Sequence, residues 1–255
     1  MRGRTETPAM PNADRVAYTA GDSVALFVPC FIDVVYPAVG KAVVSVFERL
    51  GVKLEYPAAQ TCCGQPAFNS GHWREAKELA DRFGQVFGAY RWIVVPSGSC
   101  GAMARKFFAL MEPASAAAQV GARVFDFASF LVDVLGVVDV GARFPHAVTY
   151  LDGCHGRREL GSTAAAEHLL RAVAGIDYRE LPSIDECCGF GGLFSVKYDE
   201  LSTSMGDAKC TNALSTGAQF LVSGDASCLM HVGGMLDHRG SPLKAMHLAE
   251  VLACR

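Results

Sequence analysis

Several features that mark common classes of protein are missing from this chain of 255 residues. It has no strong charge of either sign, because 26 acidic residues against 23 basic ones leave a formal net charge of −3, and this balance does not favour a nucleic-acid partner. It has no uncharged apolar run of the ~20 residues that a membrane span needs. Near its start, where a signal peptide would be apolar, it carries Pro8 and Pro11. We therefore expect a cytoplasmic protein with no nucleic-acid partner and no membrane span.

Two signatures of cofactor and metal sites are also absent. Gly191 and Gly192 lack a G-x-G-x-x-G context after a strand, so neither a nicotinamide nor a flavin site is indicated. The close C-x₂₋₄-C pairs from which structural zinc sites are usually built do not occur. What the chain does contain is 51% hydrophobic residues, enough for a substantial core, and ten cysteines. In a cytoplasmic protein, where thiols stay reduced, clustered cysteines usually bind metals or act in catalysis.

The cysteines form an internal repeat. The tripeptide Cys-Cys-Gly occurs at residues 62–64 and again at 187–189, 125 positions later. A single cysteine precedes each pair by 32 or 33 positions, and another follows each pair by 37 or 40 positions. Eight cysteines thus fall into two quartets, namely Cys30, Cys62, Cys63 and Cys100, and Cys154, Cys187, Cys188 and Cys228. Cys210 and Cys254 lie outside the repeat, and we expect them to be packing residues.

The segments around the cysteines repeat as well. In each half, an apolar run that favours a strand leads to the first cysteine, and an amphipathic helix follows it. A second helix and a buried-type strand then lead to the last cysteine, and each half closes with a helix. The expected strands cover 23–28, 92–95, 147–151 and 219–222, and the expected helices cover 39–50, 73–87, 128–135, 164–173, 200–214 and 248–252.

Strands that alternate with helices predict a parallel-sheet α/β fold. The duplication predicts two similar lobes, each with one C…CCG…C site, over residues 21–140 and 141–255, after a flexible extension over residues 1–20. Ligands of open α/β sheets bind beyond the carboxyl ends of the strands. The first and last cysteines of each quartet follow expected strands, so we predict one site per lobe.

Four thiolates that converge from separate loops suit either zinc or an iron–sulfur cluster. Adjacent cysteines can reach different irons of a cluster, and a following glycine lets the backbone donate N–H bonds to sulfur, so the spacing favours a cluster over zinc. A Cys–His nucleophile is another interpretation, since His155 follows Cys154 and His231 lies three residues after Cys228. Neither histidine has a counterpart in the other half. His72 and His247 are expected to be structural.

Several motifs resemble those of the lactate utilization protein A family, among them QTCCGQPAFNSG, VPSGSCGAM, ECCGFGGLFSVKY and GDASCLMH. The cysteine-rich CCG domain of that family is also found in a subunit of heterodisulfide reductase and in the glycolate oxidase iron–sulfur subunit. The resemblance extends from about Val24 to Ala253. It implies a cytoplasmic iron–sulfur subunit that works with two other subunits, one of them an iron–sulfur protein, to oxidise L-lactate to pyruvate. It further implies one or two 4Fe–4S clusters held by Cys30, Cys62, Cys63 and Cys100, and by Cys154, Cys187, Cys188 and Cys228.

The sequence departs from the wider CCG pattern at one position of each half. Relatives end each repeat in C-x-x-C, but the first position of that pair is Ser97 in one half and Asp225 in the other. Four cysteines per lobe suffice for a 4Fe–4S cube and are one short of the five-cysteine arrangement. Two alternatives stay open: a heterodisulfide or thiol reductase, which the missing cysteine disfavours, and a zinc-binding scaffold subunit. With no flavin or nicotinamide fingerprint, the two-electron step is open to a partner, so that either L-lactate or its electrons reach this chain.

Overall fold

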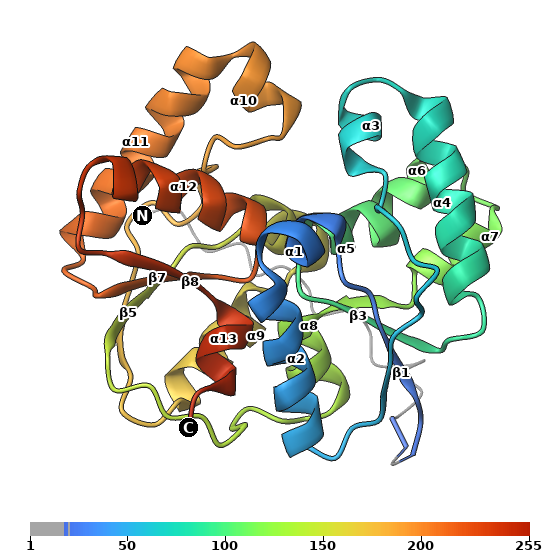
Figure 1. Ribbon diagram of the computed structural model, residues 1–255, viewed down its shortest axis with the longest axis horizontal. Helices are drawn as coiled ribbons and strands as arrows, with labels where there is room; N and C mark the ends of the chain where they lie inside the picture. Colours follow the sequence, from blue (N-terminus) through green and yellow to red (C-terminus); the bar gives the residue numbers. More distant parts are fainter. Residues whose placement is uncertain (1–17, 20) are drawn as a thin grey trace, which may run out of the picture.

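The strands of this protein lie in two separate, fully parallel four-stranded sheets (Figure 1). The computed structural model describes residues 18, 19 and 21–255, so the expected extension over residues 1–20 lies almost wholly outside the described part. The sheet orders are β2-β1-β3-β4 and β6-β5-β7-β8. The strands are β1 (Val24–Leu26), β2 (Leu54–Glu55), β3 (Trp92–Val95), β4 (Val124–Asp126), β5 (Ala147–Tyr150), β6 (Asp177–Arg179), β7 (Phe220–Ser223) and β8 (Lys244–His247).

The two sheets have the same topology, and they come from successive halves of the chain. We call the part that carries β1–β4 the first lobe and the part that carries β5–β8 the second lobe. The central pairings correspond, since β1 pairs with β3 as β5 pairs with β7. This arrangement confirms the predicted α/β class with two similar parallel-sheet lobes. The expected strands correspond to β1, β3, β5 and β7. The other four, β2, β4, β6 and β8, lie outside the expected ranges, and each is only two to four residues long.

The helices connect the strands and cover both faces of each sheet. Those of the first lobe are α1 (Cys30–Val35), α2 (Pro37–Arg49), α3 (Gln65–Asn69), α4 (Trp73–Phe87), α5 (Gly98–Ala102), the π-helical segment η1 (Met103–Phe107), α6 (Phe108–Met111), α7 (Ala116–Gly121), α8 (Phe127–Ser129) and the π-helical segment η2 (Phe130–Val134). Those of the second lobe are the π-helical segment η3 (Gly156–Leu160), α9 (Thr163–Ala172), α10 (Leu193–Lys197), α11 (Asp199–Ser215), α12 (Ala226–His238) and α13 (Leu248–Ala253). None of these helices in the described residues has both the length and the apolarity required to cross a membrane.

The ends of α2 show how local sequence sets these boundaries. The helix begins at Pro37, whose fixed φ suits the first helical position, and this places its start two residues before the expected one. It ends before Gly51, which adopts φ +68° in the left-handed region that favours glycine. Its apolar side buries Val39, Val43 and Val46. The helix therefore presents one face to the core, as the spacing of its apolar residues predicts.

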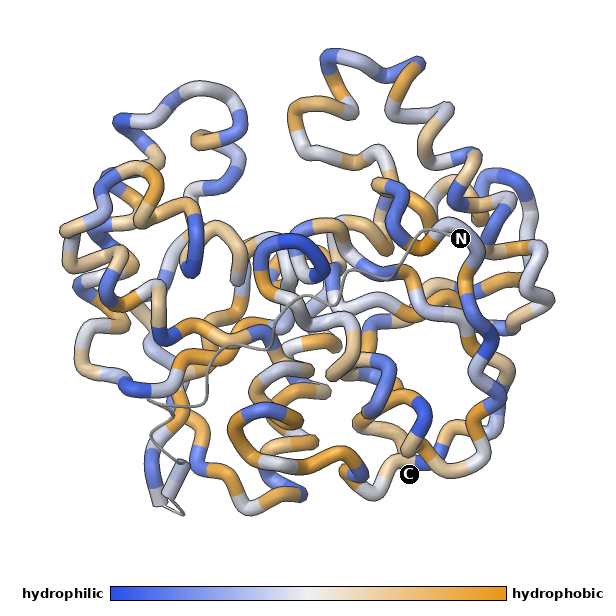
Figure 2. Tube along the Cα trace, turned by 180° about the vertical axis from the view of Figure 1, so that it is seen from behind, coloured by the Kyte–Doolittle hydropathy of each residue, from blue (hydrophilic) through white to orange (hydrophobic). Residues whose placement is uncertain are grey.

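The lobes exchange their last helices. In the second lobe α13 packs on α2 of the first, and in the first lobe α8 and η2 pack on α9 of the second (Figure 1). Residues of both lobes consequently share one hydrophobic core, and the chain trace is strongly apolar where these helices meet (Figure 2). The Arg49 guanidinium at the end of α2 donates to the carbonyl oxygens of Val140, Leu252 and Ala253. It thus ties the segment between the lobes and the end of α13 to the first lobe.

Candidate functional site

The eight repeated cysteines lie at the carboxyl ends of the strands. Cys30 begins α1 directly after β1, and Cys100 lies in α5 directly after β3. Cys154 and Cys228 follow β5 and β7 in the same way. The two Cys-Cys-Gly segments lie in the loops from β2 to α3 and from β6 to α10. Because neighbouring parallel strands end at one edge of a sheet, each quartet converges from three loops.

In the first lobe the four sulfur atoms form a chain of S–H···S contacts. Cys30 is paired with Cys62, Cys62 with Cys63, and Cys63 with Cys100. Cys63 is 2% exposed and packs in the core beside Phe83 and other apolar residues, whereas Cys30 is exposed. The quartet therefore reaches from the core of the lobe to its surface.

The second lobe repeats this chain with its own four cysteines. Cys154 is paired with Cys187, Cys187 with Cys188, and the sulfur atoms of Cys188 and Cys228 lie 3.2 Å apart. Cys188 and Cys228 are buried, and Cys154 is half-buried. The structure thus brings together both sets of four cysteines that the repeat selects, and it leaves Cys210 and Cys254 out of them. Cys210 is buried in the core below, where its thiol donates to the carbonyl oxygen of Val232 at 3.7 Å.

The glycine of each Cys-Cys-Gly segment brings its backbone amide to a sulfur atom. The Gly64 amide donates to Cys62 Sγ at 3.4 Å, and the Gly189 amide donates to Cys187 Sγ at the same distance. The two glycines adopt φ +85° and +89°, a backbone conformation that other residues rarely tolerate. They also lie against the second helix that follows in each lobe, α4 or α11, because a Cβ on Gly64 would meet the Ala76 carbonyl oxygen at 3.2 Å.

These contacts favour a negative sulfur at the first cysteine of each Cys-Cys-Gly segment. Donation from Cys30, from Cys63 and from the Gly64 amide lowers the pKa of Cys62 to about 2. The pKa of Cys30 rises correspondingly, because its thiol holds the proton that it donates to Cys62. The second lobe behaves in the same way, with the pKa of Cys187 lowered to about 2 by Cys154, Cys188 and the Gly189 amide. Thiolates are the form in which cysteine binds metals.

The chemistry of each quartet fits a thiolate-bound metal group. Each supplies four soft sulfur donors, with a backbone amide aimed at one of them, the donor set of zinc tetrathiolate and 4Fe–4S sites. No three or more His, Cys, Asp or Glu side chains among the described residues are spaced around one point as the ligands of a single metal ion. The sulfur atoms instead pair with one another, so the fit rests on the identity and number of the donors.

The two quartets flank the interface between the lobes. Phe31, which follows Cys30, packs near Phe190, which follows the second Cys-Cys-Gly, and their ring centroids lie 6.3 Å apart. The matching pair is Gln65, which follows the first Cys-Cys-Gly, and His155, which follows Cys154; their Nε2 atoms lie 3.3 Å apart. At Gly98, a Cβ would lie 3.0 Å from the backbone nitrogen of Gly156 in the opposite lobe. The backbones of the lobes therefore approach each other closely between the two sites.

Ser97 and Asp225, which replace the fifth cysteines of the wider pattern, face each other at this interface. Ser97 Oγ donates to Asp225 Oδ2 at 3.4 Å, and the Ser99 amide donates to the same oxygen at 2.7 Å. Each side chain also caps its own helix, with Ser97 accepting from the Cys100 amide and Asp225 from the Ser227 amide. These positions therefore join the lobes and start the helices that carry Cys100 and Cys228.

The two histidine candidates occupy different surroundings. His155 lies at the interface, where its Nδ1 is 3.1 Å from Glu159 Oε2 and its ring packs edge-on against Phe107. His231 lies on α12, with its Nε2 3.4 Å from the carbonyl oxygen of Ser202 under the second Cys-Cys-Gly loop. Neither histidine has a hydrogen bond to a cysteine among the described contacts, so the structure shows no Cys–His pair of the kind that activates a nucleophile.

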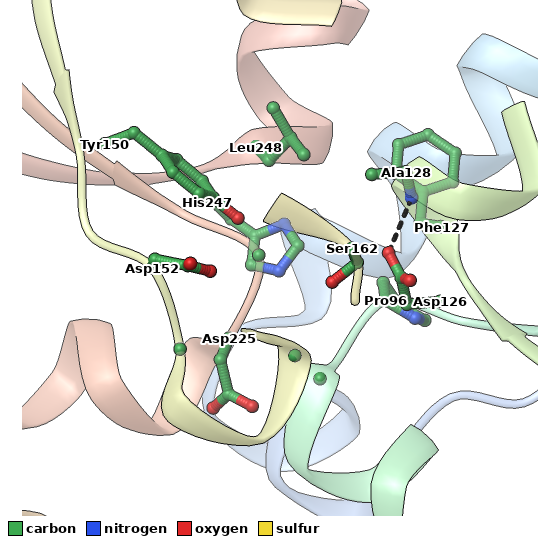
Figure 3. Close-up of a pocket in the computed structure, with 14 residues that line it drawn as sticks. Pro96, Asp126, Phe127, Ala128, Tyr150, Asp152, Ser162, Asp225, His247 and Leu248 are labelled. Atoms are coloured by element: carbon green, nitrogen blue, oxygen red, sulfur yellow. Dashed lines mark hydrogen bonds between the residues drawn. The ribbon is translucent and has the colours of Figure 1, made fainter. Parts of the chain in front are cut away.

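A buried polar cavity between the lobes was not anticipated from the sequence (Figure 3). Its wall includes Asp126, Asp152 and Asp225, together with His247. Burial raises the pKa of Asp152 to about 6 and lowers that of His247 to about 4, because both charged forms are disfavoured away from water. The only signal in the sequence is that each of these polar residues ends a strand or lies two residues after one, a position that is more often a turn.

Comparison with known proteins gives the same assignment for both halves. The profile of the cysteine-rich domain CCG matches residues 24–105 and 148–233. The chain is 45% identical over 236 residues to lactate utilization protein A 1 of Bacillus cereus (strain AH820) and to lactate utilization protein A of Bacillus thuringiensis (strain Al Hakam). Each match covers 91% of this chain and 99% of the relative.

Likeness to solved structures is distant. Glutamate racemase RacE1 from Bacillus anthracis aligns over 92% of this chain and 80% of its own, with 11% identity and a TM-score of 0.35. An aspartate racemase homologue from Pyrococcus horikoshii aligns over 91% of this chain and 96% of its own, with 10% identity and a TM-score of 0.30. At this distance the likeness has no bearing on function. By its two cysteine-rich domains and its extended identity to curated relatives, the chain belongs to the lactate utilization protein A family.

Proposed function

We propose that this chain is an iron–sulfur electron-transfer subunit of a system that oxidises L-lactate to pyruvate. One observation carries the proposal: in a chain 45% identical to lactate utilization protein A, two quartets of cysteines meet at strand ends on either side of one interface. Cys30, Cys62, Cys63 and Cys100 would hold one 4Fe–4S cluster, and Cys154, Cys187, Cys188 and Cys228 a second. Such clusters supply reversible one-electron transfer.

The chain's own residues prepare these sites for an anionic group. The amides of Gly64 and Gly189 donate to sulfur and so disperse its negative charge. Cys63 and Cys188 are buried, which keeps water from one side of each quartet, whereas the exposed Cys30 opens the first quartet to solvent. A shielded interior with one edge near the surface suits electron transfer, since a partner can bring its own redox group close to that edge.

The name of the relatives supports a place in lactate metabolism. Removing two electrons from lactate as a unit is flavin or nicotinamide chemistry, and in our proposal it takes place on one of two partner subunits in the cytoplasm, one of which is itself an iron–sulfur protein. The present chain would pass electrons singly between that partner and an acceptor. Lactate itself need not touch it.

Metal analysis of cysteine variants tests the proposal. Protein purified without oxygen should contain iron and acid-labile sulfide and absorb broadly near ~400 nm. Cys63→Ser and Cys188→Ser, made separately, should each remove about half of the iron. Cys254→Ser, which changes a half-buried cysteine outside both quartets, should retain all of it.

The alternatives predict different results from the same measurements. Stoichiometric zinc with no iron after anaerobic purification would replace the proposal with a zinc-binding scaffold. Iron-loaded protein that reduces heterodisulfides, in cells whose growth on lactate is unaffected by loss of the gene, would favour a thiol reductase. Specific loss of growth on lactate, with growth on other carbon sources intact, supports the proposed system.

A further inference from the structure

The polar cavity between the lobes lies apart from the cysteine sulfurs and is not used by the proposed function. Both lobes line it, with residues at the ends of β3 and β4 from the first lobe and at the ends of β5, β7 and β8 from the second. The space open to the centre of a water molecule is about 20 Å³. In the close-up, Ser162 lies between the imidazole of His247 and the carboxylate of Asp126 (Figure 3). His247 is 2% exposed and Asp126 is 8% exposed.

Asp126 and His247 occupy matching positions in the two lobes. Asp126 ends β4 and caps α8, and His247 ends β8 and caps α13. Each uses one atom for its cap: Asp126 Oδ1 accepts from the Ala128 and Ser129 amides, and His247 Nδ1 accepts from the Ala249 amide at 3.1 Å. The second atoms, Asp126 Oδ2 and His247 Nε2, are buried without a hydrogen-bond partner in the described structure.

The cap fixes the tautomer of His247 and so the hydrogen-bonding character of the cavity. Since Nδ1 accepts a hydrogen bond, the neutral imidazole must carry its proton on Nε2. The carbonyl oxygens of Gly224 and Pro96 face the ring and favour its protonated form, but neither has the distance and angle of a full hydrogen bond to Nε2. The cavity therefore offers an unused donor, the His247 Nε2–H, and an unused acceptor, Asp126 Oδ2.

Size, charge and donor–acceptor pattern together define the ligand. A water molecule needs a cavity of roughly 10–15 Å³, so a cavity of about 20 Å³ suits one or two waters and is too small for a carboxylic acid such as lactate. The aspartates in its wall repel anions. A metal cation satisfies a carboxylate oxygen and cannot accept a hydrogen bond from His247. Only a group that both donates and accepts satisfies the two orphaned atoms.

We propose that the lobe interface contains a binding site for ordered water, in which one molecule, or two in a chain past Ser162 Oγ, accepts from His247 Nε2–H and donates to Asp126 Oδ2. The water joins the end of the last strand of one sheet to the end of the last strand of the other. It thereby fixes the relative position of the two lobes whose interface the cysteine quartets flank. The proposal does not depend on which metal group, if any, the cysteines hold.

High-resolution crystallography of the full chain tests the site directly. We expect electron density for water within hydrogen-bond distance of His247 Nε2, linked directly or through a second water to Asp126 Oδ2. A direct bond between the two side chains, or a dry cavity, would overturn the proposal. In ¹⁵N-labelled protein, the His247 signals should show the neutral Nε2–H tautomer with exchange to bound water, and an Nδ1–H tautomer would contradict it.

A matched pair of variants separates water binding from helix capping. His247→Asn keeps an acceptor for the Ala249 amide, because asparagine is a good N-cap residue, but its side chain is too short to place an N–H donor where His247 Nε2 lies. We expect its crystal structure to show α13 intact and the water next to residue 247 lost or moved. Asp139→Asn changes an exposed carboxylate that also accepts from a backbone amide, and it should leave the water in place. An unchanged water in His247→Asn would show that His247 does not bind it.

Discussion

The two Cys-Cys-Gly loops have nearly the same conformation but rest on different surfaces. In the first lobe, the helix below the loop, α4, presents Ala76 and Phe83 to it, and Phe83 belongs to a cluster of aromatic rings. At the matching positions of the second lobe, α11 presents Ser202 and Lys209. Ser202 Oγ donates to the Gly189 carbonyl oxygen at 2.8 Å, and the buried ammonium of Lys209 donates to the carbonyl oxygen of Ser183.

This difference shows which parts of the duplicated site are constrained. The strand ends, the paired cysteines and the left-handed glycine are the same in both lobes, because they place the sulfur atoms. The support below is apolar in one lobe and polar in the other, because either kind of contact holds the loop. The polar version also puts a cation below the loop, where the charges of Glu186 and Asp185, and to a smaller extent those of the cysteines, oppose the lowering of the Lys209 pKa by burial. The two quartets are therefore similar in shape and different in electrostatic surroundings.

The largest expected difference between the lobes comes from adding one methyl group to each glycine. In Gly189→Ala the new Cβ would lie 2.6 Å from the Ser202 carbonyl oxygen, and in Gly64→Ala it would lie 3.2 Å from that of Ala76. Both changes strain a positive φ, so we expect losses in the free energy of unfolding of about 3–4 kcal/mol for Gly189→Ala and about 1–2 kcal/mol for Gly64→Ala. Urea denaturation measures both. Equal losses would show that the second loop is no more tightly packed than the first.

His247, which lies at the position that Asp126 occupies in the first lobe, should make the free energy of unfolding depend on pH. The folded pKa of His247 is about 4, below the ordinary value of 6.5, so between these pH values the unfolded chain binds a proton that the folded chain does not. Stability from this residue is fully present above pH 6.5 and falls by up to about 3 kcal/mol as the pH drops to 4. The stability of the wild type relative to His247→Asn, measured by denaturation at pH 7, 5.5 and 4.5, should fall accordingly. Parallel profiles would contradict the assignment.

Truncation of the two residues at the fifth-cysteine positions should also affect the lobes unequally. Asp225→Ala removes the cap of α12 and leaves the Ser99 amide of the other lobe without its 2.7 Å acceptor, so we expect a loss of about 2 kcal/mol. Ser97→Ala removes a weaker cap at 3.4 Å and should cost about 0.5–1 kcal/mol. Thermal unfolding distinguishes the two. A larger loss for Ser97→Ala would reverse the roles given to them.

The smallest expected effect comes from a substitution that makes the second lobe resemble the first. Ser202→Ala places alanine where the first lobe has Ala76, and it removes the buried hydrogen bond to the Gly189 carbonyl oxygen. We expect a loss of about 1 kcal/mol in the free energy of unfolding, with the metal content unchanged. Ser204→Ala, on the exposed side of the same helix, is the control and should change stability by less than about 0.5 kcal/mol. If both serines give the same result, the hydrogen bond contributes nothing to the loop.

The sequence allows the placement of the cysteines to be predicted, because a repeat that is tied to strand ends fixes where the sulfur atoms meet. It does not reveal what supports them. Lys209 on an exposed-looking helix gives no sign that it is buried under a loop, since only the path of residues 183–188 supplies its acceptor. The cavity is hidden for a related reason, because Asp126 and His247 lie far apart in sequence and meet only across the interface. Contacts between the lobes depend on how two finished sheets fit together, and no local pattern encodes that fit.

The exchange of last helices bears on the symmetry of the molecule. Each lobe covers part of its partner's core with its own final helix, so the contacts are reciprocal, as in a homodimer with a twofold axis. The chain is organised as such a dimer with its two halves fused into one polypeptide. Fusion removes the requirement that both halves stay identical. One quartet accordingly has a lysine below it and one interface position is aspartate, while the reciprocal packing keeps the two sites on either side of one interface.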